Sequence, residues 1–558
     1  MLRKIIGKGA NRPSPKLQAG VGQQRKRCGI SGISRNALEI FILGSILCVS
    51  ALIFLNTSVH YHVEVRSSGG GGGGVPKPEA AGPRRGRSSG AAADPRHGQS
   101  TFTSPALGGA RRGRFECDAD TNGMAYWNDP QDARDRSFRS PFSPPPGGGR
   151  ERYLTFEPDS GGWNNLRMSL ENIIVFAAAS GRTLVLPPDQ PIYLLKADKE
   201  NKYRGFGDFF NLHTEAFNRI VPVISTEEFI AREGGRGGRF PIPDHLRAGV
   251  HAAKNKCELR SCSLVYEYYM HYNATLQLEG TKNCLIFDER RLASAPDVDP
   301  GSEVYQHRNE RALKICSERK AVYYDATMRD AVHLHFNSHN KTHRMLTQFY
   351  AFMLFLDPAV DHFFKRLVRD HLRYRDAVFC AASKVVTRLR GEGGGSFSSM
   401  HVRRGDFQWK GMRISAEEWL ENTRGALREG ELLYISTDEQ DRKFFAPLDG
   451  RYRLRFLADF PEATAPGSLS DPNFQSMIEV LVASQGRHFV GTYFSSFSAY
   501  IGRLRGYKGI DRHLMTYSHL ERMNATHEFV WPKSSYSARE FPLGWVGIDG
   551  DEEINGFL

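Results

Sequence analysis

Residues 152–188 read RYLTFEPDSGGWNNLRMSLENIIVFAAASGRTLVLPP, and the fold prediction begins with this stretch. A short β-prone run at 152–156 leads into a turn that contains two adjacent glycines. An apolar helical pattern follows from about 166 to 179, and 183–188 predicts a second buried strand. A strand, a helix and a strand in this order form a βαβ unit, which is the building block of a parallel α/β sheet.

A second α/β run begins after the glycine-rich loop at 391–396. The pattern predicts strands at FSSMHV, ELLYIST, RYRLRFL and RHFVGT, and helices at SAEEWLENTRGAL, NFQSMIEVLVAS and SSFSAYIGRL. Ser415 and Glu418 predict a capping box at the start of the first of these helices. Residues 200–340 predict mixed short elements, and 344–372 predicts a helical stretch that is broken or kinked near Pro358. We therefore expect two Rossmann-like, doubly wound domains that face a cleft, at 148–380 and 381–558.

The basic net charge belongs to the N-terminal part of the chain. Of the formal charge of +13, residues 1–65 contribute +7 and residues 66–150 contribute +5, so about +1 remains for residues 151–558. A nearly neutral folded part argues against a nucleic-acid partner.

Residues 38–55 predict a transmembrane signal anchor, because 40–55 has no charged residue and approaches the length needed to span a bilayer. The basic tail at 1–37 predicts a cytosolic N-terminus, by the positive-inside rule. A cleaved signal peptide is the alternative, but the basic region is long for one and no small-x-small site follows. Residues 56–147 are rich in Gly, Pro, Ser and Arg, and they predict a disordered stem that holds the rest in the secretory lumen.

Six of the eight cysteines lie beyond the predicted anchor, which permits disulfide bonds in that compartment. Six cysteines allow fifteen connectivities, and the sequence does not choose among them. Cys257 and Cys262 lack a second closely spaced Cys/His pair that would complete a zinc site. Asn273, Asn340 and Asn524 begin glycosylation sequons.

Three motifs follow predicted strands, where open α/β sheets bind their ligands. In MHVRRGDFQWK, at 400–410, alternation places His401 and Arg403 on one face, where they suit a diphosphate. Arg404 then points elsewhere, with Asp406 as its expected partner. A strand end tied by Arg404 and Asp406 alone is the simpler alternative, and it leaves His401 and Arg403 unexplained.

The other two motifs are GGWNN at 161–165 and the segment VGTYFSSFSAYIGRLRGY. Glycines allow close approach of the backbone, and the amides of a helix start can bind a phosphate or a sugar hydroxyl. Ser495, Ser496 and Phe497 start the second helix, and Glu479 lies in the helix before it, where a base or ribose is within its expected reach. A plain turn, an unliganded N-cap serine and a solvated helix acid are the structural alternatives.

Together HVRRGDF, STDE and GTYFSSFSAYI, supported by GGWNN, resemble the GDP-fucose protein O-fucosyltransferase family over about 150–550. LLYISTDEQDRKFF, MIEVLVASQGRHFVGT and GWVGID look like a branch found outside animals. The anchor and stem are similar to those of Golgi glycosyltransferases, which implies a type II membrane protein of the Golgi or ER. The resemblance implies a GT-B fold, with an acceptor-side first domain, a GDP-fucose-binding second domain and inverting transfer without a metal or other cofactor.

The same resemblance implies roles for individual residues. Arg403 is the matched arginine at the β-phosphate and leaving oxygen, and His401 is the matched histidine beside it. The implied donor-binding set is Gly161, Gly162, Trp163, Asn164, Asn165, His401, Val402, Arg403, Glu479, Ser495, Ser496 and Phe497, with no metal ligand.

One departure concerns the base, because some family members carry a glutamate where this chain has Gly161. Glu157 and Asp159 are the candidate substitutes. An inactive glycan- or nucleotide-binding membrane protein is therefore one alternative function. A metal-dependent GT-A enzyme is another, and it requires a DxD metal site; such strings occur at Asp118, Asp297 and Asp549, none after a convincing apolar strand. The protein or polysaccharide that accepts the sugar is not defined by any of these motifs.

Overall fold

The computed structural model describes residues 113–128, 133–144, 150–192, 195, 202–272, 274–292, 303–316, 318–338, 343–463, 469, 471–524, 545 and 547–550. All of these fall within one compact unit, Gln99–Leu558. The predicted cytosolic tail and anchor, and the sequons at Asn273 and Asn340, lie outside the described residues. Among the helices that are described, none combines the length and the apolar character needed to cross a membrane.

The first sheet contains the predicted βαβ unit. Its strands are β1 (Tyr153–Phe156), β2 (Thr183–Leu186), β3 (Val223–Ser225), β4 (Ala274–Leu276) and β7 (His333–Phe336). They pair in parallel in the order β3-β2-β1-β7-β4. Helix α3 (Trp163–Ser180) joins β1 to β2 and ends at Gly181, whose φ of 62° is left-handed and favours glycine. The βαβ prediction is confirmed.

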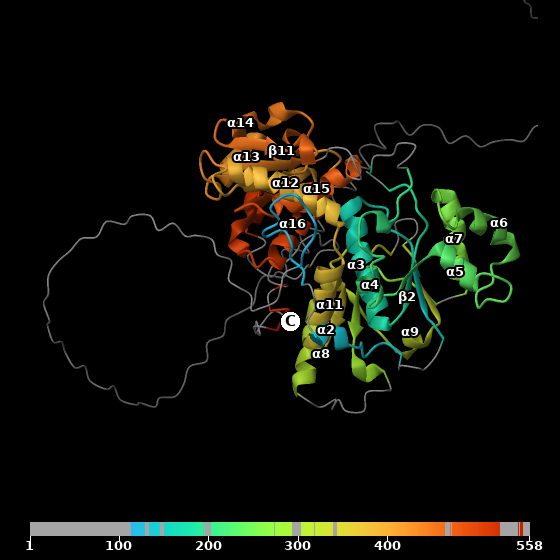
Figure 1. Ribbon diagram of the computed structural model, residues 1–558. Coiled ribbons are helices and arrows are strands. Elements are labelled where there is room, and N and C mark those ends of the chain that lie inside the picture. The colour runs from blue at the N-terminus through green and yellow to red at the C-terminus, as the bar shows by residue number, and fades with distance from the viewer. Residues whose placement is uncertain are drawn as a thin grey trace, which may run out of the picture. The chain divides into compact units, whose positions relative to one another are not determined.

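The second sheet is also parallel, in the order β11-β10-β9-β12-β13. Its strands are β9 (Ser398–Val402), β10 (Leu432–Thr437), β11 (Arg453–Phe456), β12 (Phe489–Gly491) and β13 (Met515–Tyr517). Four of the five were predicted from the sequence, and the three-residue β13 was not. The connecting helices are α12 (Asp376–Glu392), α13 (Ala416–Thr423), α14 (Ala446–Asp449), α15 (Gln475–Ala483) and α16 (Ser496–Tyr507) (Figure 1). The capping box of Ser415 and Glu418 is confirmed, with both of its hydrogen bonds formed.

A third sheet corrects the prediction for 344–372. Strands β5 (Asn283–Phe287), β6 (Lys320–Tyr323) and β8 (Met353–Phe355) pair in parallel in the order β6-β5-β8. The expected helix is a four-residue turn, α10 (Phe349–Phe352), followed by β8 and then by α11 (Pro358–His371). An unbroken apolar run fits a buried strand as well as a buried helix, and pairing with β5 decides the outcome here. Pro358 begins α11, where a missing N–H costs nothing.

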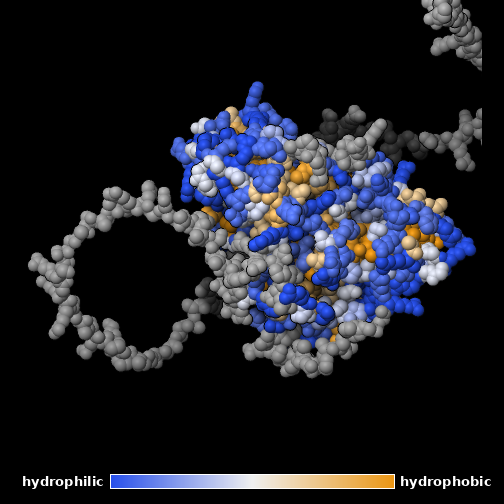
Figure 2. Space-filling view, in the orientation of Figure 1, coloured by the Kyte–Doolittle hydropathy of each residue, from blue (hydrophilic) through white to orange (hydrophobic). Residues whose placement is uncertain are grey.

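The remaining helices are short or lie between β3 and β7. They are α2 (Ala133–Ser137), α4 (Glu215–Asn218), α5 (Thr226–Glu233), α6 (Asp244–Ala253), α7 (Leu259–His271), α8 (Glu303–Ile315) and α9 (Ala326–Asp330). Helices α5, α6 and α7 lie together (Figure 1) and share an apolar core with Tyr153 of β1. The face drawn in Figure 2 is mainly hydrophilic, with apolar residues in small separate patches. Most large apolar side chains of the described residues are buried.

The folded part of the chain begins earlier than predicted. Residues 113–128 and 133–144 were assigned to the disordered stem, but Met124, Trp127 and Phe142 are buried there. Trp127 packs against Phe379 of α12, with ring centroids 4.9 Å apart. The stem prediction rested on the Gly-, Pro-, Ser- and Arg-rich composition of 56–147 as a whole. The part at 113–144 also carries large aromatic residues, and their burial packs it against the core. The domain boundary at 380/381 falls inside α12 and stays a prediction.

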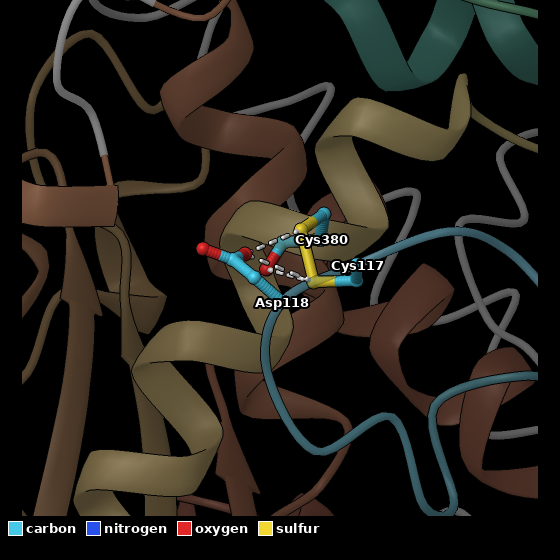
Figure 3. Close-up of side chains that lie close together, drawn as sticks. All are labelled: Cys117, Asp118 and Cys380. Carbon is cyan, nitrogen blue, oxygen red and sulfur yellow. Dashed lines mark hydrogen bonds between the residues drawn. A yellow bond between two sulfur atoms is a disulfide. The ribbon is translucent and has the colours of Figure 1, made fainter.

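The prediction of disulfide bonds is confirmed for all six cysteines beyond residue 56. The pairs are Cys117–Cys380, Cys257–Cys262 and Cys284–Cys316. The first pair joins the segment at 113–128 to α12 (Figure 3).

We expect the Cys117–Cys380 bond to stabilise the fold most, because its partners are 263 residues apart in sequence. Replacing both cysteines by serine should lower the free energy of unfolding by about 5 kcal/mol. The matched control replaces Cys257 and Cys262, which are only 5 residues apart, and should cost about 2 kcal/mol. Urea denaturation measures both losses, and an equal loss in the two variants would contradict the expectation.

Candidate active site

The carboxyl end of β9 carries His401 in a buried position. Its Nδ1 lies 2.7 Å from Oγ of Ser498, and its ring stacks on Phe497 with centroids 4.3 Å apart. Burial, together with the charge of Arg403, lowers the pKa of His401 to about 3. The imidazole is therefore neutral near pH 7. When Ser498 donates its hydroxyl proton to Nδ1, Nε2 carries the N–H and can donate it to a ligand oxygen.

Arg403 lies two residues further on and is held from both sides. Its guanidinium forms ion pairs with Asp406 and Asp438. Its backbone N–H donates to Oγ1 of Thr492 at 3.0 Å, and Thr492 donates to the carbonyl oxygen of His401 at 2.9 Å. The Arg403 side chain keeps 25% of its surface exposed, so a ligand can still reach it.

Arg404 has a different partner from the one predicted. The structure gives Asp406 to Arg403, while Arg404 donates to Glu439 at 2.9 Å. The Arg404 guanidinium also lies 3.9 Å above the ring of Phe444. The prediction assumed that Arg404 pairs with its near neighbour in sequence. Its side chain instead reaches Glu439 in the loop after β10, next to Asp438, which binds Arg403. Val402 alternates in the same way, and its side chain packs in the core on the opposite face.

The start of α16 lies beside the ring of His401. Ser495 is the N-cap residue, is buried, and makes no side-chain capping bond. The first intrahelical bond runs from the amide of Ala499 to the carbonyl of Ser495. Ser496 and Phe497 follow, and Phe497 lies against His401. A helix start of this kind favours an anion, because its amides and its dipole both point at it.

The GGWNN loop opens α3 in a similar way. Gly162 is the N-cap residue and has no side chain, and the amide of Gly161 donates to Oδ1 of Asp159 at 2.7 Å. The ring of Trp163 packs in the core at 4.3 Å from that of Phe209, so it anchors the loop. Oδ1 of Asn164 is buried without a hydrogen-bond partner among the described residues, as is Oδ1 of Asn165. Among the described residues, these two amide oxygens are the buried polar side-chain atoms of the loop that lack a hydrogen bond.

Helices α3 and α16 pack side by side and run in the same direction. The guanidinium of Arg167 lies 3.6 Å above the ring of Tyr500, and these residues come four positions after Trp163 and Ser496, the first residues of their helices. One turn further, Arg503 binds Glu171 at 2.5 Å. The two helix starts are therefore about one helix spacing apart, roughly 8–10 Å. His401 touches α16, so all three predicted motifs meet in one place.

The space beside Gly161 is occupied. A Cβ atom there would lie 2.7 Å from Nη2 of Arg344 and 2.8 Å from Oδ1 of Asp159. Arg344 binds Asp159 through two nitrogens, one of them, Nε, at 2.7 Å. Asp159 is therefore engaged in holding the loop. Glu157, the other candidate base, is buried with Oε1 3.4 Å from Nε2 of His335.

Glu479 lies on α15 near the carboxyl end of β10 and is half-buried. Burial raises its pKa to about 8, and repulsion from Asp438 adds to the shift, while Ser436 and the Thr437 amide oppose it. The buried hydroxyl of Tyr434 has no partner among the described residues. A ligand that donates N–H groups to the Glu479 carboxylate would lower this pKa, because hydrogen bonds to the charged form favour it.

Sequence reasoning missed three residues that build this site: Asp438, Thr492 and Ser498. Asp438 binds Arg403 and also accepts the amide of Arg404 at 2.7 Å. Asp438 belongs to the motif STDE, which the sequence analysis singled out without assigning a role to this aspartate. Thr492 and Ser498 join β9 to β12 and α16, and no sequence pattern indicates such contacts between strands.

One group of potential metal ligands occurs among the described residues, formed by Cys117, Asp118 and Cys380 (Figure 3). The two sulfur atoms are bonded to each other and so offer no thiolate. Asp118 forms an ion pair with Lys384 at 2.9 Å. Of the other DxD strings, Asp549 binds Arg369, and Asp297 lies outside the described residues.

His401 and Arg403, at the carboxyl end of β9, and the start of α16, after β12, lie where α/β enzymes with parallel sheets bind their ligands. Residues 153–508 match the family model described as GDP-fucose protein O-fucosyltransferase. The match covers more than half of the chain, so the chain belongs to this family and is a glycosyltransferase.

Solved structures similar to this chain include two fucosyltransferases. NodZ from Bradyrhizobium is 13% identical, with a TM-score of 0.32 over 64% of this chain and 94% of that chain. POFUT1 in complex with GDP-fucose is 12% identical, with a TM-score of 0.31 over 66% of this chain and 98% of that chain. A search of curated proteins finds no match.

The raised pKa of Glu479 predicts a pH-dependent stability. The folded chain holds a proton on Glu479 up to pH about 8, while the unfolded chain releases it near pH 4.5. Stability from this group is therefore lost as the pH rises between these values. A glutamine cannot ionise, so Glu479→Gln does not lose this stability. When the pH is raised from about 5 to about 8.5, the free energy of unfolding of the variant should therefore rise, relative to that of wild type, by at least about 1 kcal/mol.

Chemical denaturation at the two pH values measures this difference. Glu417→Gln, at an exposed position on α13, is the control and should show no such gain. A Glu479→Gln variant whose difference from wild type is the same at both pH values would contradict the shift.

Proposed function

We propose that this protein transfers fucose, with inversion, from GDP-fucose to a hydroxyl group of a protein or glycan acceptor. The observation that carries the proposal is the meeting of three motifs at one site: His401 with Arg403, the start of α16, and the GGWNN loop. Membership of the O-fucosyltransferase family supports GDP-fucose as the donor. In this proposal the fold is GT-B-like, with the donor on the second sheet and the acceptor entering from the side of the first.

The chemistry of each group suggests its part in donor binding. The diphosphate lies between Arg403 and the start of α16, where a guanidinium and helix amides both favour phosphate oxygens. Guanine presents N–H donors on its pairing edge, and the carboxylate of Glu479 accepts them. The neutral His401 donates its Nε2 proton to an oxygen next to Arg403. Asn164 and Asn165 face the sugar with their amide groups.

Arg403 carries the main part of the proposed mechanism. As the bond between fucose and phosphate breaks, negative charge develops on GDP, and a fixed guanidinium stabilises it. Cleavage that runs ahead of attack leaves a sugar with oxocarbenium character, which a weakly activated hydroxyl can attack. Such a reaction does not require a strong base, in keeping with Gly161 in the place where some family members carry a glutamate.

We expect Arg403→Ala to lower the rate of GDP release from GDP-fucose by at least about 100-fold, since the charge on the leaving group is then unpaired. Arg404→Ala is the matched control, because Arg404 is paired with Glu439 and should affect mainly folding or binding. Full-length protein in detergent and a coupled assay for GDP measure both variants. Equal release by wild type and Arg403→Ala would remove Arg403 from the mechanism.

The rival function is a binding protein that has lost turnover, and Gly161 is the observation that favours it. GDP binding, measured by calorimetry, and GDP release from GDP-fucose together separate the two functions. A wild-type protein that binds GDP but releases none from GDP-fucose, with a range of acceptors, would favour the rival function.

We propose that transfer needs no metal, and that the protein is a single-pass type II protein of the Golgi membrane or the ER with its catalytic part in the lumen. Arg403 and the helix amides supply the positive charge that a metal supplies in other transferases. GDP release should therefore be unchanged, within about twofold, in excess EDTA. Loss of release in EDTA, with recovery on adding Mn²⁺, would contradict this part of the proposal.

A further inference from the structure

Two aromatic side chains stack at the carboxyl edge of the second sheet, beside Arg403. The rings of Trp409 and Phe494 have centroids 4.7 Å apart and planes that differ by 27°. Both residues are half-buried, and Phe494 also packs on Tyr493 at 4.3 Å. We call Trp409 and Phe494 the aromatic ledge. Trp409 comes from the loop that begins with Arg403, and Phe494 from the loop between β12 and α16.

Phe494 is held in a strained backbone conformation. Its φ of 64° is left-handed, which costs an L-residue with a bulky side chain roughly 1–2 kcal/mol. The residues on either side are fixed, because the amide of Thr492 donates to the carbonyl of His401 at 3.1 Å and Ser495 caps α16. Strain of this kind persists where the surroundings enforce it, and it is concentrated at functional sites. Here its result is that the Phe494 ring lies against Trp409.

The order of the strands places the ledge on the opposite side of Arg403 from Glu479. Strand β9 lies between β10 and β12. Glu479 is beside the end of β10, close enough to Ser436 and Asp438 to interact with both. Phe494 follows β12, and Arg403 contacts both sides, through Asp438 and Thr492. Since neighbouring strands are about 4.8 Å apart, Glu479, Arg403 and the ledge form a row along one edge of the sheet.

We propose that the aromatic ledge is the subsite for a saccharide ring of the acceptor. The inference rests on the proposed function, in which the nucleoside lies at Glu479 and the diphosphate at Arg403. The fucosyl end of the donor then points toward β12 and α16. Because α16 packs on α3 of the first βαβ unit, an acceptor that enters from the side of the first sheet meets the donor there. The C–H face of a pyranose is apolar and flat and stacks on an aromatic ring, while its hydroxyl groups turn to polar neighbours such as the exposed Gln408 and Lys410.

Binding of full-length protein to an array of oligosaccharides, with GDP present, tests the subsite. Wild type should bind at least one saccharide, and Trp409→Ala should bind it about tenfold more weakly, the size expected for one lost aromatic contact. Trp409→Tyr keeps a flat ring and should retain most of the affinity. Tyr272→Ala, which removes an exposed aromatic side chain on another part of the fold, should bind as wild type does.

Three results would overturn the proposal: no saccharide bound by wild type, equal binding by Trp409→Ala, or transfer to a peptide that Trp409→Ala leaves unchanged. Calorimetry with GDP excludes a donor role, because the GDP affinity of Trp409→Ala should stay within about twofold of wild type. An equal loss of GDP affinity would assign the ledge to the donor instead. If wild type releases no GDP from GDP-fucose, the proposed transfer fails, while the saccharide array still decides the subsite. Phe494→Leu is the second variant and should match Trp409→Ala on the array if the latter folds poorly.

Discussion

The carboxylate of Glu171 holds the site together. Its two oxygens bind Arg167 of the same helix and Arg503 of α16, and all three side chains are at most 2% exposed. A buried charge is tolerated only when it is paired, so removing one partner leaves another uncompensated. The pairing fixes the register of α3 against α16, because Arg167 must also reach Tyr500. The GGWNN loop and the Ser495 segment stand next to each other for this reason, although they lie far apart in sequence.

The second constraint on the site is the number of carboxylate side chains around Arg403. Asp406, Asp438 and Glu439 engage Arg403 and Arg404, and Glu479 lies next to Asp438. A further full negative charge there would repel a diphosphate, and the raised pKa of Glu479 keeps that carboxyl largely protonated near neutral pH. A base with N–H donors would lower the pKa again. Donor binding in this scheme therefore ionises Glu479 at the moment when its charge gains a partner.

The local fold follows from the sequence because hydrophobic periodicity and glycine turns are local signals. The βαβ unit at 152–188, the capping box at Ser415 and four strands of the second sheet are of this kind. Strand β8 could not be predicted, since FMLFL is apolar throughout and only pairing with β5 makes it a strand. The disulfide partners and the packing of the 113–128 segment on α12 depend on contacts between distant residues. The same holds for the site. Strand alternation indicated His401 and Arg403, whereas the pairing of Asp406 with Arg403 and of Glu439 with Arg404 depends on the loops.

Gly161 illustrates how one position can alter the chemistry of the whole loop. A side chain there would collide with Arg344, whose guanidinium fills the space and binds Asp159. In the proposed function the loop therefore offers amide groups to the sugar, and the nearest carboxylate, Asp159, is already paired with Arg344. Under the proposed mechanism this arrangement suits a reaction in which the leaving group departs first. Stabilisation then falls to Arg403 at the diphosphate, and the loop needs only to orient the sugar and the incoming hydroxyl. The clamp of Arg344 and Asp159 gives that loop a fixed shape, which a free glutamate would not.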